Sequence, residues 1–418
     1  MSGRFHFDVV VAGGGPVGLL AGLAAARKGL VTAVLEEQWR PPARSYALAL
    51  HPASSRLFDS LGIEPEILGR ANLVEEQSFY GEGRRQAELS YTGLDGLHAY
   101  VLILPENELE RLLAAAVEQA GGKVFWGHRL SAFEQGADGV DLRVDRLTEE
   151  STGYAVGQPA AVVEATLSLR ASFLIGADGN GSLVRRSLGI EFPSVGEAAT
   201  FAVFEFGSVG PTSRELSVVL ERDSASVFWP LTKGRMRWGF ELPEFDRSVD
   251  PRLKNRLFVH FRDEAYPYVA EDKLAELVSQ RAPWFHVHIA EMYWSTVVRF
   301  EQRLADSFGK NRVWLAGDAA HLALPMAVHS MNLGFQEGAE LAERIAKIVH
   351  KGASLDEVGA YGEHRWRMWR QLVERVSNPK VDPHADGWIR DNASRIAASI
   401  PASGEDLIRL LDPLGISV

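Results

Sequence analysis

The sequence predicts an α/β protein in which a parallel sheet flanked by helices is interleaved with an antiparallel sheet and followed by C-terminal helices. Three observations predict it. Apolar runs suited to buried parallel strands recur along the 418 residues, and each is followed by a glycine-containing turn. Alternating apolar segments such as ELSVVLE and MRWGFEL favour antiparallel strands. From about residue 353 onward, charged segments containing tryptophan predict helices.

The first apolar run opens a strand–helix–strand unit. Phe7 to Ala12 is the predicted strand, and Gly13, Gly15 and Gly18 follow in G-x-G-x-x-G spacing directly before an alanine-rich helix. The first glycine permits a tight turn, the second lets the backbone approach a pyrophosphate, and the third lets the helix lie close on the sheet. N–H groups at the helix start can then bind the phosphates.

The second strand of this unit, Val31 to Leu35, ends at Glu36, where a carboxylate can accept a ribose hydroxyl. Because no arginine follows immediately, the site suits an unphosphorylated ribose, as in FAD or NAD. Strand, turn, helix, second strand and acid together predict a Rossmann-type dinucleotide site, whose phosphate contacts include Pro16 and Val17. This motif alone does not separate FAD from NAD.

The composition is that of a globular enzyme. Hydrophobic residues make up 46% and charged residues 24% of the chain, and the absence of cysteine excludes disulfides, a thiolate nucleophile and a cysteinyl flavin link. The net charge of −11 disfavours nucleic-acid and anionic-membrane partners. We find no secretory leader and no uncharged run of about 18 residues, so the sequence predicts a cytoplasmic location.

Two later apolar runs end in comparable turns. In ASFLIGADGNGSLVRR, a strand is followed by Asp178 and Gly179 and then by a helix that contains Arg185. Asp178 could cap that helix or serve a nucleotide, and the residues alone leave both interpretations open. In VWLAGD, the strand ends at Gly317 and Asp318. Ligands gather at the carboxyl ends of such strands.

The three motifs, in this order, resemble those of the FAD-dependent aromatic hydroxylases, the single-component flavoprotein monooxygenases of the para-hydroxybenzoate hydroxylase fold. The resemblance covers roughly residues 5–375 and implies non-covalently bound FAD. It implies that Asp318 holds a ribityl hydroxyl and that Asp178 and Gly179 serve the pyrophosphate side and NAD(P)H docking. Arg44 matches the flavin-contacting arginine of the family.

Two further residues match family positions. Glu106 begins the helical segment ENELERLLAAAVEQAG, where the family usually has glutamine or arginine beside FAD. Its carboxylate could contact the cofactor, or it could lie on the surface and stabilise the N-terminus of the helix. Leu130 lies where the family lends a backbone amide to adenine, and its side chain could equally belong to the core.

The segment PMAVHSMN corresponds to the loop over the flavin, which in the family usually has the pattern P-x-G-x-Q-G-x-N. The resemblance implies cofactor contacts by Pro325, Ser330, Met331 and Asn332. Backbone N–H groups at a helix start suit the pyrimidine edge of isoalloxazine, where reduction builds negative charge. Ala327 and Ser330 replace the two glycines of this pattern, so fewer backbone conformations are accessible at these positions.

His329 in this loop is the one catalytic candidate. A histidine near flavin can exchange protons around neutral pH. The hypothesis is that His329 tunes flavin reactivity or substrate ionisation. The alternative is a loop histidine that packs on the cofactor edge or hydrogen-bonds to it.

The antiparallel segments should form a second domain that covers the flavin and lines a mostly apolar pocket. We expect eight aromatic residues to gather there, and two or three of them to touch substrate: Tyr80, Tyr100, Phe204, Phe206, Phe228, Trp229, Trp238 and Phe240. The predicted domain division is 1–75, 105–190 and 299–352 for FAD, 76–104 and 191–298 for substrate, and 353–418 for C-terminal helices.

The resemblance implies a monooxygenase in which NAD(P)H reduces FAD and O2 is captured as a flavin C4a-hydroperoxide, to oxygenate an apolar, aromatic or polycyclic small molecule. With one complete dinucleotide fingerprint, NAD(P)H would bind transiently. The expected assembly is a monomer or homodimer. Two alternatives stay open, a flavin reductase or dehydrogenase of the same fold and a nonenzymatic FAD-binding protein. Flavin halogenases are disfavoured because the chain lacks W-x-W-x-I-P.

Overall fold

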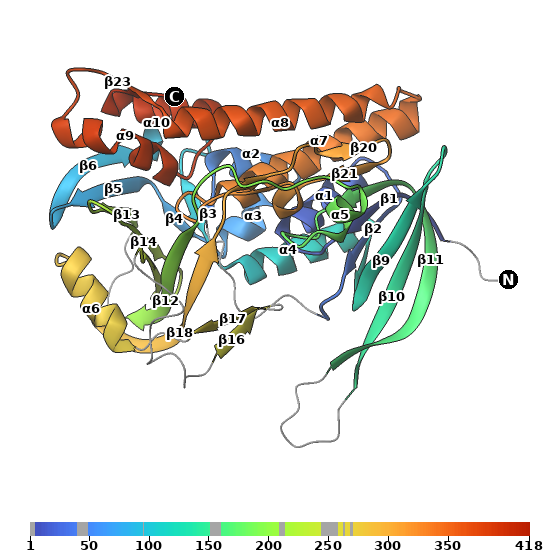
Figure 1. Ribbon diagram of the computed structural model, residues 1–418, viewed down its shortest axis with the longest axis horizontal. Helices are drawn as coiled ribbons and strands as arrows, with labels where there is room; N and C mark the ends of the chain where they lie inside the picture. The colour runs from blue at the N-terminus through green and yellow to red at the C-terminus, as the bar shows by residue number, and fades with distance from the viewer. Residues whose placement is uncertain are drawn as a thin grey trace.

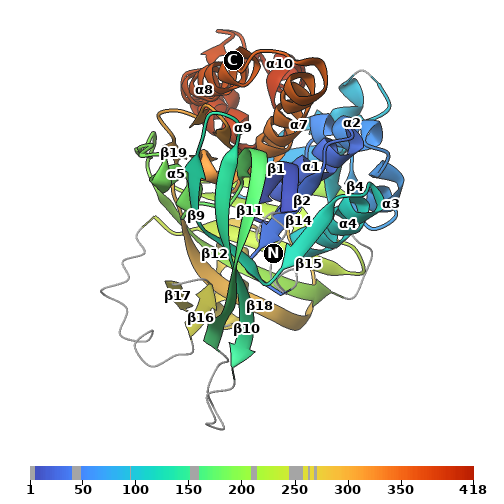
Figure 2. The same ribbon diagram turned by 90° about the vertical axis from the view of Figure 1, so that its right-hand side faces the viewer.

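The computed structural model describes residues 5–39, 49–94, 96–150, 160–208, 214–243, 258–261, 264–267 and 271–418. Two large sheets lie below a layer of helices that includes α7 (His329–Lys351) and α8 (Asp356–Ser377) (Figure 1). The view in Figure 2 places the same helices at the top, above β1 and β11. None of the helices in the described ranges has both the length and the apolar character needed to cross a membrane.

The first sheet brings together the four strands predicted to be parallel. Its order is β20 (Gly309–Lys310), β21 (Val313–Leu315), β11 (Ala160–Gly176), β1 (Phe5–Ala12), β2 (Thr32–Glu36) and β8 (Lys123–Trp126). Ala12 pairs in parallel with Leu35 and Gly176, and Gly176 pairs in parallel with Leu315. The carboxyl ends of four strands therefore lie side by side, which is where an α/β sheet binds ligands.

An antiparallel extension continues this sheet. β10 (Val140–Glu150) pairs with β11 and with β9 (His128–Gln135). Both views show β10 and β11 projecting together beyond the body of the protein (Figures 1 and 2). The long strand β11 therefore serves both the parallel sheet and this extension.

Helix α1 (Pro16–Arg27) lies between the first sheet and α7, and it is buried from Gly18 to Ala26. Its alanine-rich sequence fits this position because a helix covered on all sides has no polar face. Small residues allow the close approach: a Cβ on Gly338 would lie 2.9 Å from the Cβ of Ala21. α4 (Glu106–Gln119) also packs against α1.

The second sheet carries the alternating segments. Its order is β18 (Ile289–Phe300), β12 (Ala199–Ser208), β15 (Arg235–Glu241), β14 (Ala225–Pro230), β13 (Glu215–Leu220), β5 (Glu76–Gly81) and β6 (Arg84–Ser90). All neighbouring pairs are antiparallel except β13 with β5. One face packs on α6 (Glu271–Arg281), and the other faces the C-terminal helices and the loop before α7.

The remaining elements are short or terminal. The helices are α2 (Pro52–Ser60), α3 (Glu64–Leu68), α5 (Leu183–Ser187), α9 (Gly387–Ser399) and α10 (Gly404–Leu411). The strands are β3 (Ala49–Leu50), β4 (Asn72–Val74), β7 (Val101–Ile103), β16 (Phe258–Phe261), β17 (Glu264–Pro267), β19 (Arg303–Leu304), β22 (His321–Leu322), β23 (Lys380–Val381) and β24 (Ile416–Ser417). Single 3-10 turns are η1 (Tyr91–Gly93), η3 (Gly317–Ala319) and η4 (Asp412–Leu414).

The predicted fold class is confirmed: a parallel sheet with helices, an antiparallel sheet and C-terminal helices are all present. The division of the chain into three regions stays a prediction.

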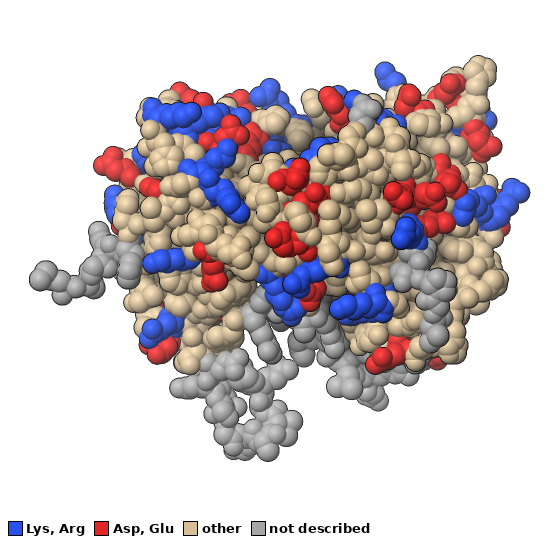
Figure 3. All heavy atoms as spheres, turned by 180° about the vertical axis from the view of Figure 1, so that it is seen from behind, with Lys and Arg blue, Asp and Glu red and all other residues tan. Residues whose placement is uncertain are grey.

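Positive and negative side chains are interspersed on the face shown in Figure 3. The surface field there changes sign over short distances.

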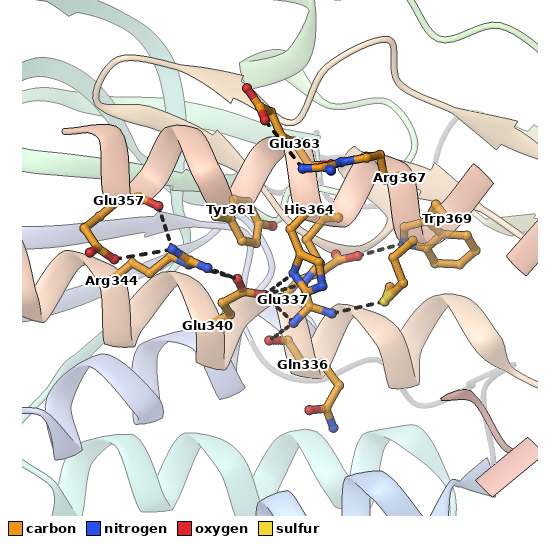
Figure 4. Close-up of polar contacts among 12 residues, drawn as sticks. Gln336, Glu337, Glu340, Arg344, Glu357, Tyr361, Glu363, His364, Arg367 and Trp369 are labelled. Carbon is orange, nitrogen blue, oxygen red and sulfur yellow. Dashed lines mark hydrogen bonds and ion pairs between the residues drawn. The ribbon is translucent and has the colours of Figure 1, made fainter. Parts of the chain in front are cut away.

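A buried carboxylate holds the helical layer together. Glu337 of α7 accepts hydrogen bonds from the Gly317 N–H at 2.9 Å and from His321 Nε2 at 2.8 Å. It also accepts one from Trp369 Nε1 of α8 at 2.8 Å (Figure 4). The His321 ring stacks on Trp369 with centroids 3.9 Å apart. Nearby, burial alone would raise the pKa of Glu340, but Arg365 and Arg344 outweigh it and hold that pKa below its usual value.

Trp369→Phe should lower the free energy of unfolding by about 1–3 kcal/mol, because the buried Glu337 carboxylate loses a donor that water cannot replace. Urea or thermal unfolding measures the change. Trp366→Phe, on the same helix but half-buried, is the matched control and should change stability by less. Equal losses in the two variants would contradict the structural role assigned to the Glu337 contact.

Candidate functional site

The three glycine-containing motifs meet at one crevice. A Cβ on Gly13 would overlap the carbonyl oxygen of Ala177, which joins the first motif to the second. A Cβ on Gly334 of α7 would lie 2.6 Å from Val17 Cγ2 and 3.0 Å from Gly317 Cα. The start of α1, the β21 turn and the first turns of α7 are therefore in van der Waals contact.

The first motif has the geometry of a phosphate site. Gly13 has φ +102°, a value that favours glycine, and a Cβ on Gly18 would overlap the Gly13 carbonyl oxygen. Gly15 is the N-cap of α1 without a side-chain cap, and a Cβ there would meet no atom within 4 Å. Pro16 occupies the first helical position. The helix start therefore faces open space that a negatively charged group can approach.

Glu36 lies at the edge of this turn. Its Oε2 accepts the Gly14 N–H at 2.6 Å, and its Oε1 accepts the Gln38 N–H at 2.9 Å. The negative charges of two other residues affect the pKa of Glu110: Glu36 and Glu106, the first residue of α4. Burial, followed by the charges of Glu106 and Glu36, raises the pKa of Glu110 to about 9. Three carboxyl groups thus share the side of the crevice where a ribose is expected.

The second motif is tied to its own helix. The N-cap of α5 is Ser182, and Asp178 supports this helix start by accepting Ser182 Oγ–H at 2.5 Å and the Val184 N–H at 3.1 Å. Burial raises the pKa of Asp178 despite these hydrogen bonds. Arg185 donates to the Ala319 carbonyl at 2.9 Å and lies over the Phe192 ring at 3.9 Å. It links the second motif to the third, and cofactor contacts by these residues stay predictions.

The third motif places Gly317 in a left-handed conformation, φ +63°, held by the hydrogen bond from its N–H to Glu337. Asp318 follows on the exposed side of the turn. Leu130 of β9 is a buried core residue beside Val144, and Gly179 has φ +76°. Arg44 lies outside the described residues.

Helix α7 begins at His329, within the segment PMAVHSMN that the resemblance assigns to the flavin loop. Val328 is the N-cap and has φ +53°, an unusual value for a β-branched residue. Positions 327 and 330, where the family has glycine, do not have positive φ. Ala327 and Ser330 therefore have backbone conformations that suit any residue, and the left-handed residue of this loop is Val328.

Asn332 fixes this loop to the start of α2. Its side-chain amide donates to the Ala49 carbonyl at 2.9 Å and to the Val328 carbonyl at 2.8 Å, and its oxygen accepts the His51 N–H at 2.9 Å. Ser330 Oγ–H donates to the His321 carbonyl at 3.3 Å. Met331 is buried in the core, and Pro325 lines the adjoining cavity.

His329 points into the protein. Its Nε2 is 3.0 Å from the Ala402 carbonyl, and its ring meets that of His51 edge to face at 5.5 Å. Burial lowers the pKa of His329 to about 4, and the hydrogen bonds that the ring donates to backbone carbonyls of Ala402 and Ile400 only partly offset this effect. Burial and the neighbouring His329 lower the pKa of His51 to about 3. Both rings are neutral at pH 7, with Nε2–H as the donor to a carbonyl.

A cavity separates this loop from the second sheet. Pro325 and Val328 form one side of it. The other described lining residues come from the sheet, and all but Arg237 and Gly239 are apolar: Phe201, Val203, Val227, Trp229, Arg237, Gly239 and Phe300.

Seven of the eight aromatic residues expected there lie elsewhere. Tyr80, Phe204, Phe206, Phe228, Trp238 and Phe240 form the core on the α6 face of the sheet. Tyr100 donates to Glu64 at 2.6 Å, and only Trp229 of the eight belongs to the cavity lining in the described ranges. The expected gathering of all eight at the pocket is therefore corrected. Side chains alternate between faces, so Phe201 and Val203 reach the cavity and Phe204 and Phe206 do not.

Comparison with known proteins decides the family. The sequence model of one protein family, described as FAD binding domain, matches residues 6–376. The chain belongs to this family. The predicted cofactor, FAD, is thereby confirmed, and the open helix start at Gly15 and the carboxylate of Glu36 fit its pyrophosphate and ribose.

Named relatives agree with the predicted resemblance to aromatic hydroxylases. The chain is 28% identical over 370 residues to the 12-dehydrotetracycline 5-monooxygenase/anhydrotetracycline 6-monooxygenase of Streptomyces rimosus, covering 86% of this chain and 66% of the relative. It is 26% identical over 361 residues to the rifampicin monooxygenase of Rhodococcus hoagii, covering 86% and 67%. The chain thus spans about two thirds of the length of these relatives.

A solved structure shows the same fold. The p-nitrophenol 4-monooxygenase of Pseudomonas putida superposes with a TM-score of 0.72 at 20% identity, covering 99% of this chain and 97% of that one.

Gly15→Ala should weaken FAD binding by tenfold or more, about 1.4 kcal/mol, because its methyl group enters the open space at the helix start. The apoprotein should keep its thermal stability, since φ −70° suits alanine. FAD titration by fluorescence quenching and thermal unfolding of the apoprotein measure the two effects. Gly18→Ala should lower both FAD affinity and stability, the latter by about 1–3 kcal/mol. Normal FAD affinity in Gly15→Ala would contradict this geometry.

The buried histidines should make the protein acid-sensitive. Unfolded histidine binds a proton below about pH 6.5, whereas folded His329 does so only near pH 4, so stability falls between these values. The loss is up to about 1.4 kcal/mol per pH unit for each histidine. His329→Gln keeps an N–H donor without this titration, so the free energy of unfolding in urea should fall less steeply between pH 6.5 and 4.5, with His51 left to titrate. His350→Gln, at an exposed site, is the control, and an unchanged slope in His329→Gln would refute the assignment.

Proposed function

We propose that this FAD-binding chain is a monooxygenase that uses NAD(P)H and O2 to oxygenate an apolar, aromatic or polycyclic small molecule. The supporting observation is the position of the cavity. Pro325 and Val328 form one wall, directly before the start of α7, and the second sheet forms the other. A substrate bound there would lie beside the helix start at which the flavin ring is expected.

The protein's own part in this reaction follows from the site. Bound FAD would supply hydride acceptance from NAD(P)H and activation of O2. The α7 N–H groups would stabilise negative charge at the flavin edge. Asn332 and His329 hold that helix start in place from two directions. Phe201, Trp229 and Phe300 would exclude water and pack against an apolar ring system.

The named relatives support the substrate class. They include monooxygenases named for anhydrotetracycline and rifampicin and a hydroxylase named for 3-(3-hydroxy-phenyl)propionate. These names cover both polycyclic and single-ring aromatic molecules. The cytoplasmic location, the transient NAD(P)H partner and the monomer or homodimer state stay predictions from the sequence.

Substrate-dependent oxygen incorporation tests the proposal. The FAD-loaded protein is supplied with NADPH or NADH, 18O2 and, in turn, anhydrotetracycline, rifampicin or 3-(3-hydroxyphenyl)propionate. We expect at least one compound to accelerate NAD(P)H oxidation and to gain one 18O atom by mass spectrometry. The Gly15→Ala variant, with weakened FAD binding, is the negative control.

Two outcomes would replace this function by another. NAD(P)H oxidation coupled to reduction of the compound, without 18O in the product, would show a flavin reductase of the same fold. Tight flavin binding without NAD(P)H oxidation across a broad aromatic panel would show a binding protein.

A further inference from the structure

A glycine lies in the middle of the cavity wall that the second sheet forms. Gly239 of β15 belongs to the cavity lining, and in the sheet register it stands between Val203 of β12 and Val227 of β14. Glycine in the interior of a strand weakens a sheet, because it has more conformational freedom to lose on folding and no side chain to pack. Strand stability therefore does not explain this residue.

Backbone conformation and packing do not require glycine at this position either. Gly239 does not have a positive φ. A Cβ on it would lie 3.5 Å from Val227 Cγ1 and 3.9 Å from Phe201 Cδ1, which are ordinary van der Waals distances. Apart from its chain neighbours, no other atom of the described residues lies within 4 Å of that point. Alanine would thus fit into the sheet, and the space above Gly239 is open to the cavity.

Two other glycines in the strands of this sheet each have an aromatic side chain directly above them. A Cβ on Gly81 of β5 would lie 2.6 Å from Trp388 Nε1, and a Cβ on Gly207 of β12 would lie 2.9 Å from the Tyr293 hydroxyl oxygen. At both positions, the missing side chain makes room for an aromatic residue of the chain itself. Gly239 offers the same kind of room on the face that lines the cavity.

The one charged residue of the described cavity lining leaves this room open. Arg237 precedes Gly239 by two residues in β15, so its side chain leaves the same face of the sheet. It donates Nη2–H to Glu205 of β12 at 2.5 Å and Nε–H to the same carboxylate oxygen at 3.2 Å, and its guanidinium lies over the Trp294 ring at 4.9 Å. No atom of Arg237 comes within 4 Å of a Cβ placed on Gly239.

We propose that Gly239 determines the specificity of this cavity for flat ring systems. Its backbone, with Phe201 and Val227 beside it, forms a ring seat on which one face of an aromatic substrate lies. The other face of the substrate is turned toward the loop that contains Pro325 and Val328. A saturated ring system of the same outline is thicker and fits this space less well. The inference rests on the proposed function, because it names the substrate shape that the same cavity accepts.

Two matched probes test the ring seat without turnover: 2-naphthol and decahydro-2-naphthol. They share one carbon skeleton and one hydroxyl group, and only the first is flat. Each is titrated into the FAD-loaded protein without NAD(P)H, and binding is measured by isothermal titration calorimetry. We expect 2-naphthol to bind about tenfold more tightly or better, which is the scale on which a pocket discriminates by small differences in apolar bulk.

Gly239→Ala should weaken 2-naphthol binding by about tenfold and leave decahydro-2-naphthol binding almost unchanged, because its methyl group occupies the ring seat. The melting temperature of the FAD-loaded variant should stay the same or rise, since alanine restricts the unfolded chain. Gly207→Ala is the matched control. It makes the same substitution on the adjacent strand outside the described cavity lining, and the Tyr293 side chain above it is 42% exposed and can move. The preference for 2-naphthol should persist in this control.

Three results would overturn the ring seat. They are the absence of a preference for 2-naphthol in the wild-type protein, an undiminished preference in Gly239→Ala, and a lower melting temperature of Gly239→Ala, which would show that the fold itself requires glycine. The two proposals fail separately. Oxygen incorporation without a preference for the flat probe overturns the ring seat alone, and that preference without oxygen incorporation overturns the monooxygenase alone.

Discussion

The contact on which the rest of the structure depends is a crossing of backbones without intervening side chains. Gly13 abuts Ala177, Gly18 abuts Gly13, and Gly334 abuts Gly317 and Val17. Each approach is closer than a Cβ permits, so the ends of three strands and the starts of two helices can share one edge of the sheet. This arrangement leaves open space at Gly15, which is the predicted place of the FAD pyrophosphate.

Hydrogen bonds along α7 connect this backbone contact to the loop beside the cavity. Glu337 binds the β21 turn to α7 and α8, and Asn332 binds the first turn of α7 to the segment before α2. Val328 is thereby held in a conformation that valine rarely adopts. A helix start fixed in this way can present its N–H groups without rearranging when charge develops.

The parts that the sequence predicted were those with local causes. Gly13, Gly18 and Glu36 follow from the spacing of one unit, and the order of the three motifs led to the fold. An apolar pocket was predicted, but most of its lining residues were not, because they depend on which face of each strand is covered. Phe201 and Phe204 are equally aromatic, and only the packing of α6 separates them. Arg237 could not be singled out from the sequence, because it belongs to no motif and its partner Glu205 is a neighbour only across the sheet.

The hydrogen bond between His329 and Ala402 joins the loop to a stretch of chain beyond residue 376, where the match to the family ends. α9 and α10 of that stretch also pack on the face of the second sheet that lines the cavity. Substitutions in this peripheral segment can therefore alter the loop while every cavity residue stays the same. Under the proposed function, residues beyond 376 can thus influence substrate choice without lining the cavity.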